Sequence, residues 1–187
     1  MVQRESEALV AATQRLIDHT RVEQRFTADD IRRMHRLWLG EIYVWAGEHR
    51  QVNMGKGDFM FAAAAQVPRL MHELERGALR ELTPCRFQSA AEQAHALAVV
   101  HAELILIHPF REGNGRCARL LATLMGLQAG LPALDFGGIR GKTKQRYIAA
   151  VHAAVGRDYR PMAEIFGAVI ARTLRSRANA SSARGRS

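Results

Sequence analysis

The apolar residues of this 187-residue chain recur with the spacing of helices and do not alternate as they do in strands. Hydrophobic residues make up 48% of the chain, and most of them are Ala, Leu, Ile and Val. A chain of this length usually forms one domain around one core. The sequence therefore predicts an all-α fold, with a single domain over residues 1–177.

The end of the chain differs from the rest in its charge. The formal net charge is +9, and the five arginines from residue 172 onward have no acidic residue among them. Residues 178–187 are predicted to be a basic, disordered tail. The rest of the chain is only mildly basic and contains no DNA-reading motif, so no specific nucleic-acid partner is expected. A non-catalytic module that binds nucleic acid or protein through these arginines stays an alternative.

The two cysteines and the short apolar runs indicate where the protein works. Cys85 and Cys117 lie far apart and form no ligand-like pair, which favours a reducing compartment. The fully apolar stretches, Leu104–Ile107 among them, are all far shorter than the roughly 20 residues of a membrane span. The first ten residues contain no apolar signal core. We expect a soluble, cytoplasmic protein with no membrane partner.

Capping and turn residues locate the elements. Thr27 with Asp30, and Ser89 with Glu92, have the spacing of capping boxes at helix starts. The segment from residue 49 to 61, HRQVNMGKGDFMF, alternates around the turn GKGD and predicts a short β-hairpin. The predicted helices cover about residues 4–19, 27–40, 67–81, 90–107, 114–128, 143–155 and 161–177.

The stretch IHPFREGNGRCARLL, residues 107–121, carries the candidate site. Pro109 forbids continuation of the preceding helix, and the next helix begins near Asn114. Gly113 and Gly115 lack side chains, so backbone amides at this helix N-terminus can approach a phosphate closely. Arg116 and Arg119 share one side of the first turn and can bind further phosphoryl oxygens. This part of the stretch predicts a phosphate-binding cradle.

Two further residues of the same stretch have the chemistry of a phosphoryl-transfer site. Glu112 directly precedes the cradle and offers an oxygen ligand for the Mg²⁺ that accompanies a nucleotide. His108 has an ordinary pKa near 6.5 and is suited to take a proton from an attacking hydroxyl. A lone histidine or a lone Gly-x-Gly turn is usually only structural, but the combination within twelve residues favours a functional site.

At this point the sequence resembles the Fic (filamentation induced by cAMP) family. HPFREGNGR followed by Cys117, Ala118 and Arg119 matches the motif His-Pro-Phe-x-Asp/Glu-Gly-Asn-Gly-Arg-x-x-Arg at every specified position. The segment WAGEHRQVNMGKGDFMFA, residues 45–62, is similar to the one that leads into the β-hairpin flap over the active site of these proteins. The resemblance implies a Fic-type helical core over about residues 30–170, with a short β-hairpin flap.

The activity implied by the resemblance is that of a protein adenylyltransferase, or AMPylator. Such an enzyme uses ATP as co-substrate and transfers AMP to a Ser, Thr or Tyr hydroxyl of a target protein, which docks on the flap. By motif position His108 would be the general base, Glu112 the Mg²⁺ ligand and Phe110 a buried anchor. The nucleotide phosphates would be held by Gly113, Asn114, Gly115, Arg116 and Arg119. Lys56, in the flap turn, would reach the nucleotide or line the target groove, or be an ordinary exposed turn residue.

Two features of the sequence refine this implied function. The kinase-like Doc branch departs from the motif at the second glycine, whereas this chain keeps Gly115. That favours AMP transfer, while Doc-like or other nucleotide-derived group transfer stays open. The inhibitory pattern Ser/Thr-x-x-x-Glu-Gly/Asn of many family members, whose glutamate would pair with Arg119 here, is absent from the sequence. We therefore predict a separate small antitoxin protein that supplies this glutamate, with this chain as the toxin of the pair; an effector, or a chain controlled by oligomerisation, stays the alternative.

Overall fold

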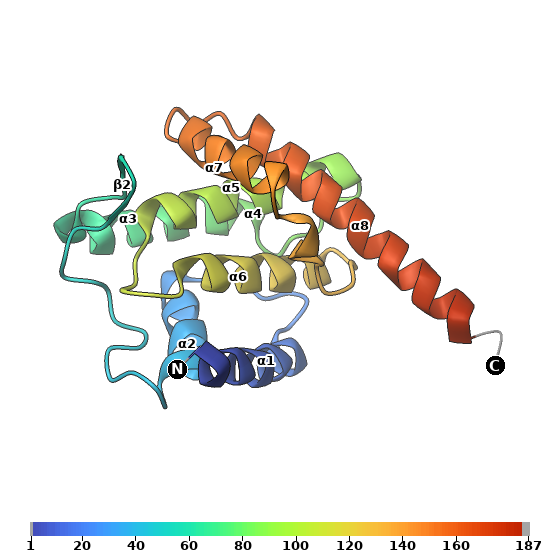
Figure 1. The fold of residues 1–187 in the computed structure, drawn as a ribbon, viewed down its shortest axis with the longest axis horizontal. Helices are drawn as coiled ribbons and strands as arrows, with labels where there is room; N and C mark the ends of the chain where they lie inside the picture. Colours follow the sequence, from blue (N-terminus) through green and yellow to red (C-terminus); the bar gives the residue numbers. More distant parts are fainter. Residues whose placement is uncertain (1, 185–187) are drawn as a thin grey trace.

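Two helices joined by the motif loop form the centre of the molecule. This computed structural model describes residues 2–184. Helices α5 (Ala90–Ile107) and α6 (Asn114–Gln128) pack against each other. Figure 1 shows α7 (Lys142–Ala154) and α8 (Arg160–Arg184) on one side of this pair, and α1 (Val2–His19) and α2 (Ala28–Leu39) on the other. The predicted all-α fold class is confirmed.

Helix α5 is the core helix of the fold. It packs against α3, α6, α7 and α8, so apolar residues are needed around its whole circumference. By length and composition alone α5 could cross a membrane, but 61% of that 18-residue window is buried inside the protein. Its capping box is present as predicted. The Ser89 side chain accepts a hydrogen bond from the Glu92 backbone amide, and the Glu92 carboxylate accepts one from the Ser89 backbone amide.

Most other helix limits follow the sequence signals. The capping box of Thr27 and Asp30 opens α2, and α6 spans the predicted residues 114–128. The predicted helix over 67–81 is interrupted: α3 (Val67–Leu74) passes into a π-helical turn, η2 (Glu75–Leu79), before the short α4 (Arg80–Leu82). Gly77 departs from helical geometry there, with φ −97° and ψ −105°. Two 3₁₀ turns, η1 (Ala64–Gln66) and η3 (Phe136–Gly138), were not predicted.

The predicted hairpin is present and is shorter than its alternating sequence suggests. Strands β1 (Gly55–Lys56) and β2 (Phe59–Met60) pair antiparallel, with Gly55 opposite Met60 and Lys56 opposite Phe59. Gly57 adopts φ +59° in the two-residue turn, a conformation that suits glycine. The hairpin lies beside the end of α5 that leads into the motif loop (Figure 1). It is therefore placed to cover that loop.

The predicted end of the last helix at residue 177 is wrong. Helix α8 continues to Arg184, so most of the segment predicted to be a disordered tail is helical. Residues 174–180 are exposed, and no Pro or Gly lies between Pro161 and Gly185 except Gly167. Alanine and arginine are good helix formers, so the helix continues without a core to pack against. The last three predicted tail residues lie outside the described residues, and the predicted domain limits stay a prediction.

Candidate active site

The loop over residues 108–113 begins with a strained histidine. His108 ends α5 in the left-handed conformation, with φ 52° and ψ 58°, and its N–H donates to the Leu104 carbonyl at 3.0 Å. A residue other than glycine takes this conformation at an energetic cost, which the surrounding contacts must offset. Pro109 follows at once and prevents another helical turn. The chain therefore turns sharply and presents the His108 side chain at the end of α5.

Side chains of the motif itself fix the rest of the loop. The Asn114 side chain accepts from the Phe110 N–H at 2.9 Å and donates to the Phe110 carbonyl at 2.8 Å. Phe110 is fully buried, which confirms the predicted anchor. Gly113 has φ +79°, and a Cβ there would lie 2.6 Å from the Trp38 ring. The loop thus requires both glycine at position 113 and the amide at position 114.

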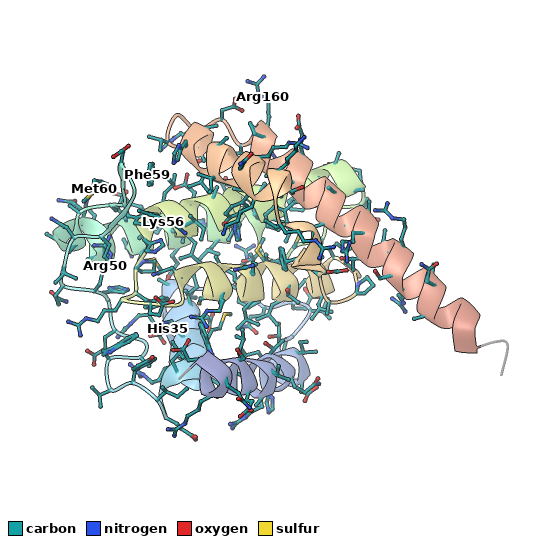
Figure 2. All side chains as sticks on the ribbon, viewed as in Figure 1. His35, Arg50, Lys56, Phe59, Met60 and Arg160 are labelled. Carbon is teal, nitrogen blue, oxygen red and sulfur yellow. The ribbon has the colours of Figure 1, made fainter. Side chains whose placement is uncertain are left out.

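His35, on α2, holds the loop from behind. Its Nδ1 accepts from the Gly47 N–H at 2.9 Å, so Nε2 carries the proton and donates to the Glu112 carbonyl at 3.0 Å. The ring stacks on Phe110 with a centroid distance of 3.9 Å. Burial lowers the pKa of His35 to about 4, so the ring stays neutral in this role. Figure 2 shows His35 between α2 and the start of α6.

The His108 imidazole is oriented by two contacts. Its Nδ1 donates to the Ile105 carbonyl at 3.2 Å, and the ring stacks on Phe61 with a centroid distance of 3.6 Å and an interplanar angle of 11°. In the neutral ring, Nε2 then carries the lone pair that is free to accept a proton. Burial lowers the pKa of His108 to about 4, and the positive charges of Arg50 and Lys56 act in the same direction. At neutral pH the ring can therefore accept a proton at Nε2.

A cleft of about 970 Å³ opens beside this ring. It brings together four of the predicted site residues: His108 from the loop, Gly115 and Arg119 from α6, and Lys56 from the hairpin. The Nε of Arg119 donates to the Gly115 carbonyl at 3.1 Å, which holds this exposed guanidinium along the first turns of α6. Gly115, in the first turn of α6, and the cationic side chains of Arg119 and Lys56 therefore line one cavity, which suits an anionic substrate.

The opposite wall of the cleft was not predicted from the sequence. Helix α7 supplies Lys144, Tyr147, Ile148, Val151 and His152, and Ile139 lies before it. Phe59 of the hairpin stacks on His152 with a centroid distance of 4.7 Å. The Tyr147 hydroxyl bonds to Nε2 of the buried His101 at 2.8 Å, and burial raises the pKa of Tyr147 to about 12. This wall is mainly apolar and aromatic, so it can accommodate a flat, uncharged group next to the phosphate end.

Arg116 faces away from the residues that line the cleft. One guanidinium nitrogen lies 2.9 Å from the Glu5 carboxylate, the other lies 2.9 Å from Glu112, and the group stacks 4.6 Å from the Trp38 ring centre. Glu5 is buried, and hydrogen bonds from Tyr43 and then Arg116 lower its pKa. The structure therefore places this predicted phosphate ligand in an ion network with α1.

Glu112 can serve as a ligand for Mg²⁺ only together with the substrate. Its side chain is 58% exposed and its backbone is fixed by His35, so its carboxylate is accessible beside the cradle. Among the described residues there is no group of three or more His, Cys, Asp or Glu that could hold a metal. Mg²⁺ commonly takes one or two carboxylates and completes its shell with phosphate oxygens and water. The residues present fit that mode.

The supporting residues outside the motif had no clear signal in the sequence. His35, Trp38 and Glu5 occur in ordinary helical patterns, and the motif residues that they contact, Glu112 and Arg116, lie 77 to 111 residues away along the chain. Arg50 is an exception, because it lies within the segment at residues 45–62 that resembles the lead into a flap. The resemblance of this segment predicts that Arg50 lies near the flap, but it does not predict a contact between Arg50 and His108.

The sequence pattern of the Fic/DOC family matches residues 25–125 of this chain. Protein adenylyltransferase fic-1 of Caenorhabditis briggsae is 34% identical over 134 residues, which are 71% of this chain and 25% of that protein. Protein adenylyltransferase VbhT of Bartonella schoenbuchensis is 30% identical over 61% of this chain and 24% of its own length. The chain thus spans about a quarter of the length of these two relatives. It covers 67% of the probable protein adenylyltransferase y4lH of Sinorhizobium fredii, at 30% identity over 71% of this chain.

Solved structures share the fold. The BepC effector protein of Bartonella tribocorum, with bound AMPPNP, superposes with a TM-score of 0.70 at 25% identity, over 90% of this chain and 85% of that one. A fragment of Fic-1 from C. elegans has a TM-score of 0.75 at 24% identity, over 97% of this chain and 52% of that one. The helical arrangement described here therefore agrees with experimentally determined structures.

Proposed function

This chain belongs to the Fic/DOC family, and on that premise we propose that it is a protein adenylyltransferase that moves AMP from ATP to a Ser, Thr or Tyr hydroxyl of a target protein. One observation carries the proposal: His108, neutral at physiological pH, shares a cleft with the start of α6 and with Arg119 and Lys56. The names of the curated relatives, protein adenylyltransferases, support the same chemistry.

The proposed reaction needs one proton acceptor and one anion site. The Nε2 atom of His108 takes the hydroxyl proton of the target as the hydroxyl oxygen attacks the α-phosphorus of ATP. The bond between the α-phosphorus and the oxygen that bridges to the β-phosphate breaks, and pyrophosphate leaves with that oxygen. The amides at the start of α6 and the Arg119 guanidinium stabilise charge on the phosphoryl oxygens. Catalysis on this scheme is mainly positioning and electrostatics.

Glu112 would hold Mg²⁺, which when bound supplies positive charge next to the phosphates. Arg116 orients that carboxylate through its ion pair and stacks on Trp38. A direct contact of Arg116 with the leaving phosphates, as the motif predicts, requires its ion pair with Glu5 to open. Asn114 acts through the loop, because both polar atoms of its amide are bonded to Phe110. The Lys56 ammonium lies where it can reach the phosphates or the target.

The cellular role that we propose is that of a toxin in a toxin–antitoxin pair, acting in the cytoplasm. A small antitoxin would supply a glutamate to Arg119, which is exposed and has no carboxylate partner among the described residues. Pairing would remove a positive charge that the triphosphate needs, with no change of fold. Expression of the chain alone in bacteria, beside its His108→Ala form, tests this role. Growth arrest that depends on His108 is the expected result, and normal growth with an active wild-type enzyme would contradict it.

The transfer itself is tested with ATP labelled at the α- or the γ-phosphate, incubated with purified protein, Mg²⁺ and cell lysate. We expect only the α label on a protein band. His108→Ala should lower the transfer rate by at least about 100-fold and leave ATP affinity within about threefold, because the imidazole removes a proton and does not bind the phosphates. If the γ label appears on the protein instead, the reaction is Doc-like phosphoryl transfer and the proposal of AMP transfer is wrong. If neither label is transferred, the proposal is refuted.

A further inference from the structure

Arg50 is a buried cation outside the motif that contacts the catalytic loop. It lies in the segment between α2 and the hairpin, and its side chain is only 1% exposed. Figure 2 shows it on the side of the molecule where the hairpin and Lys56 lie. Burying a guanidinium is unfavourable unless its donors are satisfied, so its contacts explain why it is there.

The guanidinium donates to four backbone carbonyls in three segments. Nε donates to the His108 carbonyl at 2.7 Å, and a terminal nitrogen donates to the Ile107 carbonyl at 3.3 Å. The same nitrogen also bonds to the Ala62 carbonyl, and the other terminal nitrogen bonds to the Val52 carbonyl at 2.6 Å. One side chain therefore joins the end of α5 to both ends of the hairpin segment.

Neighbouring backbone bonds extend this junction. The Arg50 N–H donates to the Pro109 carbonyl at 2.8 Å, and the Ala62 N–H donates to the Leu106 carbonyl at 3.2 Å. Among the described residues no carboxylate lies within ion-pair distance of Arg50, so its charge is met by carbonyl dipoles, including those at the end of α5. The arrangement depends on the geometry of the guanidinium as well as on its charge.

Two of these contacts converge on the His108 ring. The bond from Nε holds the backbone of His108 in its left-handed conformation, and the bond to Ala62 fixes the residue that follows Phe61, the stacking partner of the ring. We propose that Arg50 is a positioning residue, which sets the orientation of the His108 imidazole and couples it to the hairpin that receives the target. The catalytic part of this inference rests on the proposed function.

Lysine cannot replace arginine in this junction. An ammonium keeps the charge but has a single nitrogen, which cannot reach the carbonyls of His108, Val52 and Ala62 at once. Arg50→Lys therefore separates geometry from charge. Arg32→Lys is the matched control, because Arg32 also donates through Nε to a backbone carbonyl, that of Gly47, and does not touch His108 or the hairpin.

The experiment compares wild type, Arg50→Lys and Arg32→Lys in AMP transfer, ATP binding and histidine NMR. In Arg50→Lys we expect kcat to fall about 100-fold with ATP affinity within about threefold, because a small displacement of the base is costly. The ring protons of His108, assigned with the His108→Ala form, should lose the shift caused by the Phe61 ring. Amide exchange should rise in residues 52–62 and at Ile107 and His108, while α1 and α2 keep their protection. Arg32→Lys should behave as wild type.

The NMR and exchange measurements do not need activity, so they test Arg50 even if wild type transfers no AMP and the proposed function fails. Unchanged His108 signals in folded Arg50→Lys would overturn the positioning role, as would a kcat within threefold of wild type. If Arg50→Lys does not fold, Phe61→Leu tests the second path to the ring. That variant should fold and lose about tenfold in kcat, since one of two orienting contacts is removed. Wild-type turnover in Phe61→Leu would overturn the proposal.

Discussion

At the scale of single residues, the two motif glycines have different reasons to be glycine. Gly113 has φ +79° and its Cβ would lie 2.6 Å from Trp38, whereas a Cβ at Gly115 would meet only the Arg119 guanidinium at 3.8 Å. Position 113 therefore excludes a side chain because of the fold. Position 115 tolerates one in the fold, but a methyl group there would lie at the wall of the cleft, next to the amides that we propose bind phosphate.

Alanine substitutions separate these two reasons. We expect Gly113→Ala to lower the free energy of unfolding by about 2–4 kcal/mol, from left-handed strain and overpacking together. Gly115→Ala should leave stability within about 1 kcal/mol of wild type, since alanine is favoured in helices. It should weaken ATP binding nonetheless. Urea unfolding and nucleotide titration of both variants measure this, and equal stability losses would contradict the assignment.

The motif residues were predictable because their signal is local, whereas their supports were not. His108, Phe110, Gly115 and Arg119 lie within twelve residues, in the motif loop and the first turns of α6. Glu5 contacts Arg116 across 111 residues of chain, and no spacing rule applies to a pair so far apart. The sequence therefore predicted the chemistry of the site better than the direction in which Arg116 points.

At the scale of elements, the buried Glu5 carboxylate ties α1 to α6. It accepts from the Tyr43 hydroxyl at 2.7 Å and from Arg116 at 2.9 Å. Glu5→Gln keeps the shape and removes the charge, so we expect a loss of about 1–3 kcal/mol in unfolding free energy at pH 7. The loss should fade as the pH falls through the lowered pKa of Glu5, because the wild-type carboxylate then becomes protonated as well.

Glu7→Gln is the control for this prediction, since Glu7 is exposed on the same helix, where its carboxylate accepts a hydrogen bond from the Gln3 side chain at 3.0 Å. Its stability should stay within about 0.5 kcal/mol of wild type, as for most surface changes. Equal effects of the two substitutions in urea unfolding would show that the Glu5 network does not hold α1.

Element limits were predictable where the signal is a cap or a proline. The boxes at Thr27 and Ser89 and the break at Pro109 needed only neighbouring residues. The π-helical turn around Gly77 depends on how two helical pieces fit against α5, which is a tertiary effect. The end of α8 differs from the prediction because a run of arginines without acidic residues is also typical of disordered tails, whereas the helix propensity of alanine and arginine continues the helix here.

At the scale of the whole molecule, buried histidines make stability depend on pH. His35, His101 and His108 each have a pKa lowered to about 4, chiefly by burial. Between pH 6.5 and 4 the unfolded chain binds more protons at these sites than the folded chain, so unfolding becomes easier as the pH falls. Each histidine adds up to about 1.4 kcal/mol per pH unit to this slope.

We therefore expect the urea midpoint to fall steadily from pH 7 to pH 4.5. His35→Gln removes one of the three groups and should reduce this slope, whatever its effect on stability at pH 7. His95→Gln, at an exposed position on α5, should leave the slope unchanged. A slope that is the same in His35→Gln and wild type would show that His35 does not contribute.

The tie between Glu5 and Arg116 also bears on how such a catalytic unit can be transferred between genes. The family pattern matches residues 25–125, yet the buried one of the two carboxylates that pair with a motif arginine comes from residue 5. A recombination event that moved only the matched stretch would leave Arg116 with the exposed Glu112 alone, and the Trp38 indole N–H without the Glu5 carbonyl that accepts its hydrogen bond. A transferred segment that keeps this network is thus longer than the stretch that the family pattern matches. A chimaera that preserves the network has to include α1 as well as the motif.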